Sequence, residues 1–288
     1  MSPRAIVVGV AGSGNLIINW AAREARLQRR PLRIAHVLEW DADEAREASG
    51  STYVERVWSA SAAITDAAVR QARDAEPEVD VTADTLVGQP AARLLELARE
   101  AELMVVGYRG RGGFAGLRLG SVSQQVATQA PGPVVVVRGT PRPDGPVVAG
   151  VDRSPAADQV LDAAFTAAAA RGAGLVVVRS YAPAMQVWVA SIRPAEVATP
   201  EQDAAARTLV EEQLAPWRGK FPDVPVEIRL TRDAIAPVLV GAAAEAQLVV
   251  VGSHGRGPIR GALLGSTGLH LLRHAECPVL VARAHRET

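Results

Sequence analysis

The stretch LVVVGSHG at residues 248–255 joins a run of four apolar residues to a turn that contains two glycines. Continuous apolar runs of this length are typical of strands that are buried on both faces, as the strands of parallel sheets are. After nine intervening residues come Gly265 and Ser266, which would open the next helix. The stretch therefore predicts the strand, loop and helix of an α/β unit, with a glycine-rich loop after the strand.

The same pattern occurs once before in the chain. Residues 103–110 read LMVVGYRG, and after nine intervening residues come Gly120 and Ser121. The strand, the two glycines of the turn and the glycine before the helix therefore have the same spacing in both places.

Two further segments of the sequence are duplicated. The run IVVGV at residues 6–10 returns as VVAGV at residues 147–151, and PVVVVR at residues 133–138 returns as PVLVAR at residues 278–283. Between the copies lies GTPRPDGP at residues 139–146, whose glycines and prolines are typical of a linker. Because these segments keep their order, the chain consists of two copies of one sequence pattern.

The duplication predicts two domains of similar size, residues 1–140 and 145–288. In each domain, short β-branched runs alternate with segments of helical pattern. Residues 90–98, for example, place apolar residues on one helix face after a proline that suits the first turn. The alternation predicts an α/β fold of two tandem doubly wound, Rossmann-like domains, each with a parallel sheet that carries helices on both faces.

The composition excludes several classes of function. The 31 Lys and Arg residues balance 31 Asp and Glu residues, so the chain lacks the basic excess with which nucleic-acid-binding proteins neutralise phosphates. Cys277 is the single cysteine, which excludes a disulfide framework and a cysteine-based metal site. Lys220 is the single lysine, and its surroundings match neither a Walker A loop nor a kinase-type catalytic lysine.

The apolar runs are short. None approaches the length of about 18 residues that a membrane span needs. The apolar residues 5–10 are better explained as a first buried strand than as a signal peptide, because they run directly into glycine. A lone cysteine fits a reducing compartment, so we expect a cytoplasmic protein.

The two glycine-rich loops carry the functional signal. In open α/β sheets, ligands bind beyond the carboxyl ends of the strands at the point where the strand order reverses, and both loops follow such a strand. Glycine lets the backbone approach a phosphate closely, and the free N–H groups at the start of the next helix attract an anion. A simple chain turn is the alternative for one such loop, but two loops with the same spacing favour phosphate binding.

The spacing G-x2-G-x9-G-[S/T] after the fourth strand is similar to the ATP-binding signature of the universal stress proteins. The segments VGV at residues 8–10, WAAREA at 20–25, VGSHGRG at 251–257 and CPVLV at 277–281 resemble that family as well. The resemblance covers nearly the whole chain as a tandem pair. It implies five parallel strands per domain in the order 3-2-1-4-5, an ATP-class nucleotide lying across strands 1 and 4, and pairing of the domains through their last strands.

The resemblance also assigns the residues that would bind the nucleotide. Asp152 matches the aspartate with which the family ends strand 1, whereas Ala11 takes its place in the first copy. Losing this acceptor leaves a polar ligand group unpaired, at a cost of about 1–3 kcal/mol, so we expect the second site to be the stronger. The expected binding residues are Asp152, Gly252, Gly255, Gly265, Ser266 and Thr267 in the second copy and Val37, Gly107, Gly110, Gly120, Ser121 and Val122 in the first.

Other positions around the expected sites differ between the copies. After strand 2, the first copy has the family-like HV at residues 36–37 and the second has RS at residues 179–180. Before the third helix, the first copy has GQP at residues 88–90 and the second has DAI at residues 233–235. Two equal sites are therefore not expected. Asp152 also has an alternative role, as the cap of the helix that follows it.

These observations predict an ATP-binding regulatory protein of the stress response, with Mg²⁺ as a companion of the phosphates. Two alternatives stay open: an interaction module that acts through domain pairing without a nucleotide, and a slow ATPase. No nucleophile–base pair or carboxylate pair supports a true enzyme, so no catalytic residue is assigned. The expected partners are ATP and the paired domain. A homodimer and further protein partners stay open, and neither nucleic acid nor a membrane is expected.

Overall fold

The computed structural model describes residues 3–12, 15–39, 51–110, 119–140, 142–154, 156–181, 200–253 and 264–284. The chain divides into two compact units. The first comprises Met1–Val137 and Ala284–Thr288, and the second comprises Arg138–Arg283. Each unit is described by itself below.

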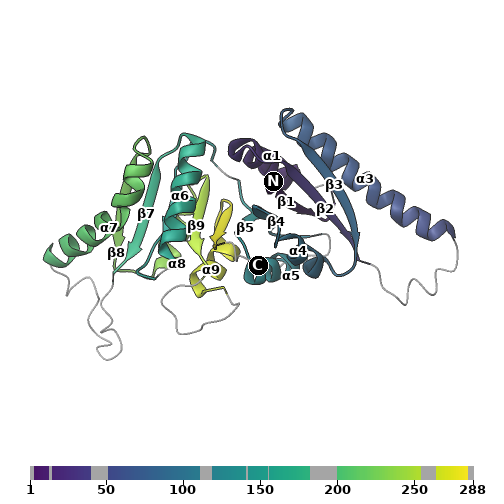
Figure 1. The fold of residues 1–288 in the computed structure, drawn as a ribbon. Coiled ribbons are helices and arrows are strands. Elements are labelled where there is room, and N and C mark those ends of the chain that lie inside the picture. The colour runs from purple at the N-terminus through teal and green to yellow at the C-terminus, as the bar shows by residue number, and fades with distance from the viewer. Residues whose placement is uncertain are drawn as a thin grey trace, which may run out of the picture. The chain divides into compact units, whose positions relative to one another are not determined.

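The first unit alternates strands and helices along the chain (Figure 1). Its elements are β1 (Ile6–Val10), α1 (Asn15–Gln28), β2 (Leu32–Leu38), α3 (Ser51–Ala75), β3 (Val81–Val87), α4 (Pro90–Leu97), β4 (Leu103–Gly107), α5 (Ser121–Gln129) and β5 (Val134–Val137). The second unit repeats this order. Its elements are β6 (Val147–Gly150), α6 (Ala157–Arg171), β7 (Leu175–Ser180), α7 (Pro200–Lys220), β8 (Val226–Thr231), α8 (Ile235–Ala243), β9 (Leu248–Gly252), α9 (Ser266–His274) and β10 (Val279–Ala282).

Neighbouring strands within each unit run parallel. In the first unit the strands lie in the order β3-β2-β1-β4-β5, and in the second in the order β8-β7-β6-β9-β10. The helices form two layers, since α1 packs with α3 and α4 with α5, while α6 packs with α7 and α8 with α9. The predicted α/β, doubly wound class is therefore confirmed.

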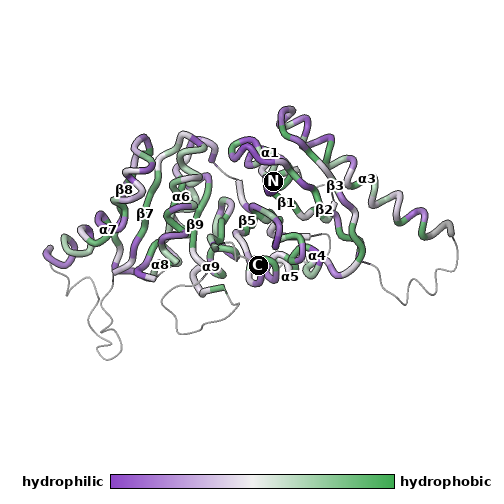
Figure 2. Tube along the Cα trace, in the orientation of Figure 1, coloured by the Kyte–Doolittle hydropathy of each residue, from purple (hydrophilic) through white to green (hydrophobic). Residues whose placement is uncertain are grey.

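The core of each unit consists of its central strands and the inner faces of the helices. Figure 2 shows apolar residues following the strands, whereas apolar and polar residues alternate along the helices. Val105 in β4 and Val250 in β9 are completely buried, as is Phe165 in α6. A parallel sheet with helices on both faces requires such strands, because neither face of the sheet meets water.

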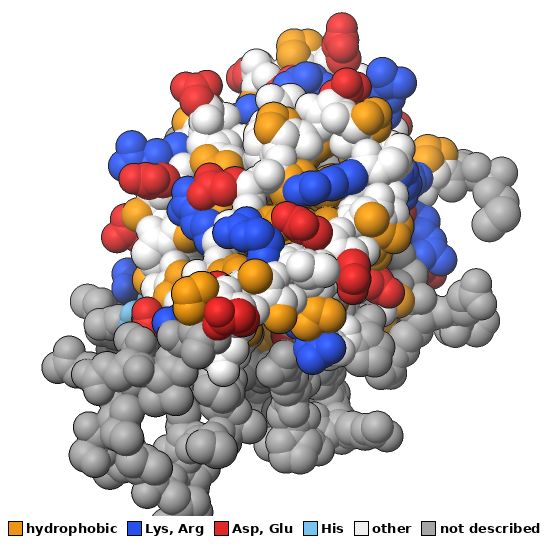
Figure 3. Space-filling model, turned by 90° about the vertical axis from the view of Figure 1, so that its left-hand side faces the viewer, with side chains coloured by type: hydrophobic (Ala, Val, Ile, Leu, Met, Phe, Trp, Pro, Cys, Tyr) orange, Lys and Arg blue, Asp and Glu red, His pale blue; other side chains and the backbone are white. Residues whose placement is uncertain are grey.

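The outer surface carries both signs of charge. Figure 3 shows acidic and basic side chains interspersed on the described part of the face formed by the β8 and α7 side of the second unit. Arg229 pairs there with Glu227 within β8, and Lys220 at the end of α7 pairs with Asp162 of α6. Among the described residues, no helix has the length and apolar character to cross a membrane.

A glycine in the first strand of each unit lets a helix pack closely against the sheet. A Cβ on Gly9 would lie 2.9 Å from both terminal carbons of Leu94 in α4. A Cβ on Gly150 would lie 2.6 Å from a terminal carbon of Leu239 in α8. Both leucines are buried, so these positions of the strands leave little room for a side chain. This contact sets the distance between the first strand and the helix beside its carboxyl end.

We therefore predict that Gly150→Ala destabilises the protein by about 1–3 kcal/mol, because an added methyl group overpacks a filled core. Gly241→Ala is the matched control. A Cβ at Gly241 in α8 meets nothing within 4 Å, and alanine is the better helix former by about 1 kcal/mol. Urea unfolding of both variants measures the difference. Equal or greater stability of the Gly150 variant would contradict the packing argument.

Candidate functional site

The first strand of each unit lies between two strands whose crossovers leave in opposite directions. In the second unit, β6 pairs with β7 on one side and with β9 on the other, with Ala149 opposite Val250. Because the strands are parallel and in register, the residues that follow them emerge together at the carboxyl edge of the sheet. Asp152 and Ser253 thus both lie just past the strand ends at this edge.

The loop after β9 is tied at its base. The N–H of Gly265 donates to the carbonyl of Ser253 at 2.8 Å, and Ser253 is buried. The helix α9 then begins at Ser266, with Gly265 as its N-cap and no side-chain hydrogen bond capping it. The first N–H groups of α9, including that of Thr267, therefore form an anion-attracting helix start. Gly252 ends β9 at the same edge.

The first unit builds the same loop base. The N–H of Gly120 donates to the carbonyl of Tyr108 at 2.8 Å, which places the start of α5 beside the end of β4. The hydroxyl of Ser123 donates to the carbonyl of Gly107 at 2.5 Å. A Cβ on Gly110 would lie 3.8 Å from the Cβ of Ala11. The loops after β1 and β4 therefore meet at the carboxyl edge.

The structure brings together most of the predicted site residues at these two edges. Ser121 and Val122 form the start of α5, which Gly120 caps without a side-chain hydrogen bond. Val37 is half-buried and lies opposite Leu86 near the end of β2. Gly255 lies outside the described residues.

Asp152 forms a tight turn with Ser154. Its Oδ1 atom accepts a hydrogen bond from the Ser154 N–H at 2.9 Å and another from the Ser154 hydroxyl at 2.5 Å. This is an Asx turn, which fixes the carboxylate relative to the strand end. The alternative role of Asp152 as a helix cap is wrong, because α6 has Ala156 at its N-cap, with no side-chain hydrogen bond there. Asp152 is half-buried and lies just past the end of β6.

The strand beside the first strand is β2 in the first unit and β7 in the second. Near its carboxyl end, the two units have different residues at the same position. In the first unit, His36 is buried, and its Nδ1 atom lies 2.9 Å from the carbonyl oxygen of Val10. In the second unit, Arg179 takes this place and is only 3% exposed. Its Nη1 atom donates to Oε1 of Gln213 at 3.4 Å, and Nε2 of Gln213 donates to the carbonyl of Asp152 at 3.4 Å. Nothing in the sequence pattern distinguishes Gln213 from the other polar residues of α7.

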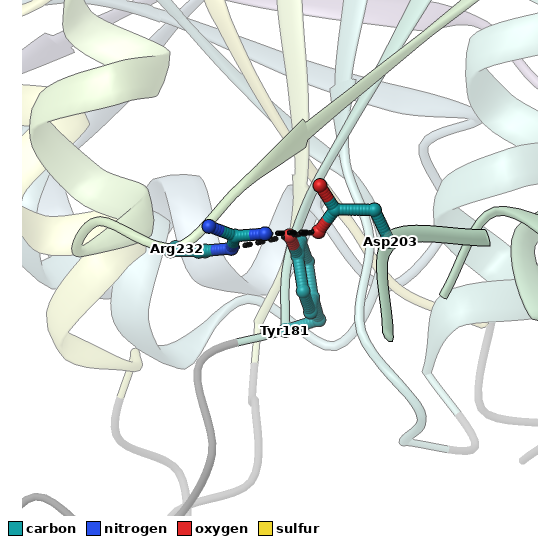
Figure 4. Close-up of polar contacts among 3 residues, drawn as sticks. All are labelled: Tyr181, Asp203 and Arg232. Atoms are coloured by element: carbon teal, nitrogen blue, oxygen red, sulfur yellow. Dashed lines mark hydrogen bonds and ion pairs between the residues drawn. The ribbon is translucent and has the colours of Figure 1, made fainter. Parts of the chain in front are cut away.

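A cluster of three polar side chains closes the β7–β8 side of the second edge. Figure 4 shows Tyr181, Asp203 and Arg232 converging from the end of β7, the first turn of α7 and the end of β8. The Arg232 guanidinium donates to the Tyr181 hydroxyl at 2.7 Å and to Asp203 Oδ1 at 2.5 Å, and the Tyr181 hydroxyl donates to the same carboxylate oxygen. The cluster joins three elements that are far apart in the sequence.

The environment of this cluster shifts the proton affinities of its members. Hydrogen bonds from Tyr181, and then from Arg232, hold the pKa of Asp203 below its ordinary value. Burial, followed by the hydrogen bond to Asp203, raises the pKa of Tyr181 above its ordinary value. The neutral phenol and the ionised carboxylate are therefore the stable forms around neutral pH.

The corresponding corner of the first unit is apolar. The matching positions at the end of β2, in α3 and at the end of β3 hold Leu38, Trp58 and Val87. Trp58 is 43% exposed and Val87 is 37% exposed. The two units thus share the glycine loops but differ in the chemistry of the neighbouring corner.

Other candidate groups are excluded by their surroundings. Cys277 is buried, and burial raises its pKa to about 12, so it is no nucleophile at neutral pH. Cys277 packs as a small buried hydrophobe. Within the described part of the chain, no group of three or more His, Cys, Asp or Glu side chains is arranged to hold a metal ion.

Two tandem doubly wound units, each with a glycine-rich loop at its strand switch, define a class of α/β proteins with ligand sites at the carboxyl edge of the sheet. The family model described as "Universal stress protein family" matches residues 3–138 and again residues 145–283. The chain belongs to the universal stress protein family.

Relatives of similar length share this organisation. The chain is 33% identical over 299 residues to universal stress protein Rv1996 of Mycobacterium tuberculosis, covering 96% of this chain and 94% of the relative. It is 35% identical over 298 residues to a universal stress protein of Mycolicibacterium smegmatis, covering 96% of each. The crystal structure of a universal stress protein from Archaeoglobus fulgidus superimposes with a TM-score of 0.71 at 16% identity, covering 97% of this chain and 98% of that one. That last likeness concerns the fold alone.

The Tyr181–Asp203–Arg232 cluster predicts an acid-sensitive contribution to stability. Because the folded pKa of Asp203 lies below its ordinary value, the stabilisation is present above that ordinary value and is lost as the pH falls through the folded pKa. We expect Asp203→Asn to lower the melting temperature at pH 7 and the difference from wild type to shrink as the pH falls below that ordinary value.

Melting curves from pH 7 downward test this prediction, with Asp223→Asn as the control. Asp223 is an exposed aspartate of the same unit. A melting-temperature difference for Asp203→Asn that does not shrink as the pH is lowered would show that the carboxylate charge does not stabilise the cluster.

Proposed function

We propose that the protein is an ATP-binding regulatory protein of the stress response, with the nucleotide held at the strand switch of each unit and more strongly in the second. One observation carries the proposal. In the second unit, an anchored carboxylate at the end of the first strand and an uncapped helix start after the fourth strand lie at the same edge. A nucleotide has a hydroxyl-bearing sugar at one end and anionic phosphates at the other, and these two features complement its two ends.

The phosphate end of the ligand is held by backbone groups in this proposal. The N–H groups at the start of α9, around Gly265 and Ser266, supply donors, and the helix dipole adds a positive potential. The tie between Gly265 and Ser253 sets where these donors point. Mg²⁺ accompanies the phosphates as their own counterion, since Mg²⁺ in such sites keeps water and phosphate ligands.

The sugar end of the ligand is held by Asp152. Both Ser154 hydrogen bonds go to Oδ1 of this carboxylate. An ionised carboxylate offers about four acceptor positions on two oxygens, so acceptor capacity is left for the hydroxyl groups of a ribose. The Asx turn fixes the carboxylate before the ligand arrives, which reduces the entropy lost on binding.

The first unit is the weaker site in this proposal. Ala11 offers a methyl group where the second unit has a carboxylate, although the helix start at Gly120 and Ser121 is equivalent. A first unit that binds no nucleotide and acts as an interaction module is the second candidate, and Ala11 is the observation that favours it. Slow ATP hydrolysis, a cytoplasmic location, pairing of the units through their last strands and a homodimer all stay predictions.

We expect Asp152→Ala to weaken ATP binding at the second site about tenfold to a hundredfold, because a ribose hydroxyl loses its acceptor at a cost of about 1–3 kcal/mol. Equilibrium dialysis with labelled ATP measures this loss. Asp162→Ala is the matched control, since Asp162 is an exposed carboxylate of the same unit that pairs with Lys220. Equal affinity of the Asp152 variant and the wild type would refute the site assignment, and absence of ATP binding by the wild type would refute the function.

The reverse change tests the first site. Ala11→Asp introduces the missing carboxylate at an exposed position, beside a glycine that leaves room for it. We expect the number of tightly bound ATP molecules per chain to rise from about one to about two, with the new site gaining about tenfold or more in affinity. If the Ala11→Asp variant, which keeps Asp152, still binds about one ATP per chain, the result would favour the interaction module for the first unit.

A further inference from the structure

We infer that Arg179 is a positioning residue of the second site, acting on Asp152 through Gln213. The inference rests on the proposed nucleotide site and goes beyond it, because neither residue would touch the nucleotide. The observation that carries it is a continuous polar chain beneath the strand end, from the Arg179 guanidinium to the Gln213 amide and on to the Asp152 carbonyl.

Arg179 lies directly beside the segment that leads from β6 to Asp152. The N–H of Val151 donates to the carbonyl of Val178 at 3.0 Å, and parallel strands are about 4.8 Å apart. Side chains alternate along β7, and the next residue, Ser180, donates to the carbonyl of Asp233. Arg179 therefore points to the opposite face of the sheet, where α7 packs and supplies Gln213.

The position of Gln213 on α7 follows from the packing of that helix. Ala206, Val210 and Leu214 are the buried residues of α7, and Gln213 borders this apolar stripe at the end of β6. Its amide can donate with one end and accept with the other. It accepts from Arg179 and donates to Asp152, so a single side chain connects the cation to the turn.

Arginine is the side chain that can hold this place. It remains charged when it is buried, and its planar group keeps several donors in a fixed arrangement. At 3% exposure, Arg179 cannot serve as an ordinary surface charge. Through Gln213, the buried guanidinium holds the backbone of the turn that presents the Asp152 carboxylate.

The first unit shows that this position supports the first strand in a different way. His36 occupies it and contacts the carbonyl of Val10 directly. The two units thus use the same position on the second strand to hold the end of the first. Only the second unit, in which the first strand ends in a carboxylate, places an always-charged side chain there.

A double-mutant cycle tests the inference. We expect Arg179→Met to weaken ATP binding about threefold to tenfold in the wild-type background, and by less than about twofold when Asp152 is already alanine. Arg179→Lys should recover part of the affinity. The control is Arg229→Met, which removes an exposed arginine of the neighbouring strand that pairs with Glu227.

Gln213→Met provides a second variant, because it leaves the buried charge in place and breaks only the connection. We expect it to match the loss seen with Arg179→Met. Amide hydrogen exchange provides a measurement that needs no nucleotide. The N–H of Ser154, which donates to Asp152, should exchange about threefold to tenfold faster in both variants and at the wild-type rate in Arg229→Met.

The outcomes separate the inference from the proposed function. Losses of equal size in the presence and absence of Asp152 would overturn the inference and leave ATP binding intact, and so would unchanged exchange at Ser154. If the wild-type protein does not bind ATP, the proposed function fails, and the inference fails with it. Non-additive losses together with faster exchange at Ser154 would support the positioning role.

Discussion

The parallel pairing of one central strand with two neighbours is the constraint on which both units depend. In the first unit β1 lies between β2 and β4, and in the second β6 lies between β7 and β9. Right-handed crossovers to the two sides must pass over opposite faces of the sheet, so the chain diverges at the carboxyl edge of the central strand. The loops that follow these strands consequently emerge at the same edge of the sheet. Asp152 and the start of α9 lie at one edge for this reason.

The elements fixed by this constraint are those that the sequence predicts well. The apolar runs at residues 103–107 and 248–252 form the buried strands β4 and β9, because only a strand covered on both faces tolerates an uninterrupted apolar run. The glycine spacing after them predicts where α5 and α9 begin, and the observed starts are Ser121 and Ser266. Local pattern and global fold agree at these positions, as they do in sequences that fold to one structure.

The parts that escaped prediction depend on distant contacts. Asp203 meets Arg232 across 29 residues, and Gln213 meets Asp152 across 61 residues. Neither contact has a local signature in the sequence. Both depend on the residue at which α7 begins and on the position of α7 along the sheet. Asp152 itself was recognised, but its partner was not: the carboxylate closes a turn with Ser154 and does not cap α6. Spacing indicates which residues share an edge, and packing decides which of them touch.

The two copies show which positions the fold restricts and which it leaves free. Both units keep a glycine in the first strand under a buried leucine, because the helix beside it approaches too closely for a side chain. At the half-exposed corner, by contrast, Tyr181, Asp203 and Arg232 in one unit correspond to apolar residues in the other.

The place of the lone lysine adds to this contrast. Lys220 ends α7, whose first turn touches the carboxyl edge through Asp203. A helix rises about 1.5 Å per residue, so Lys220 lies about 25 Å along the helix from that edge. Its ammonium group pairs with Asp162 instead. In the proposed site, the phosphates would therefore be held by fixed backbone donors rather than by a lysine. Such donors stabilise the charge that a bound nucleotide already carries. Because they bind the ground state and the transition state about equally well, they do not by themselves accelerate transfer of a phosphate group. The arrangement favours holding a nucleotide as a ligand.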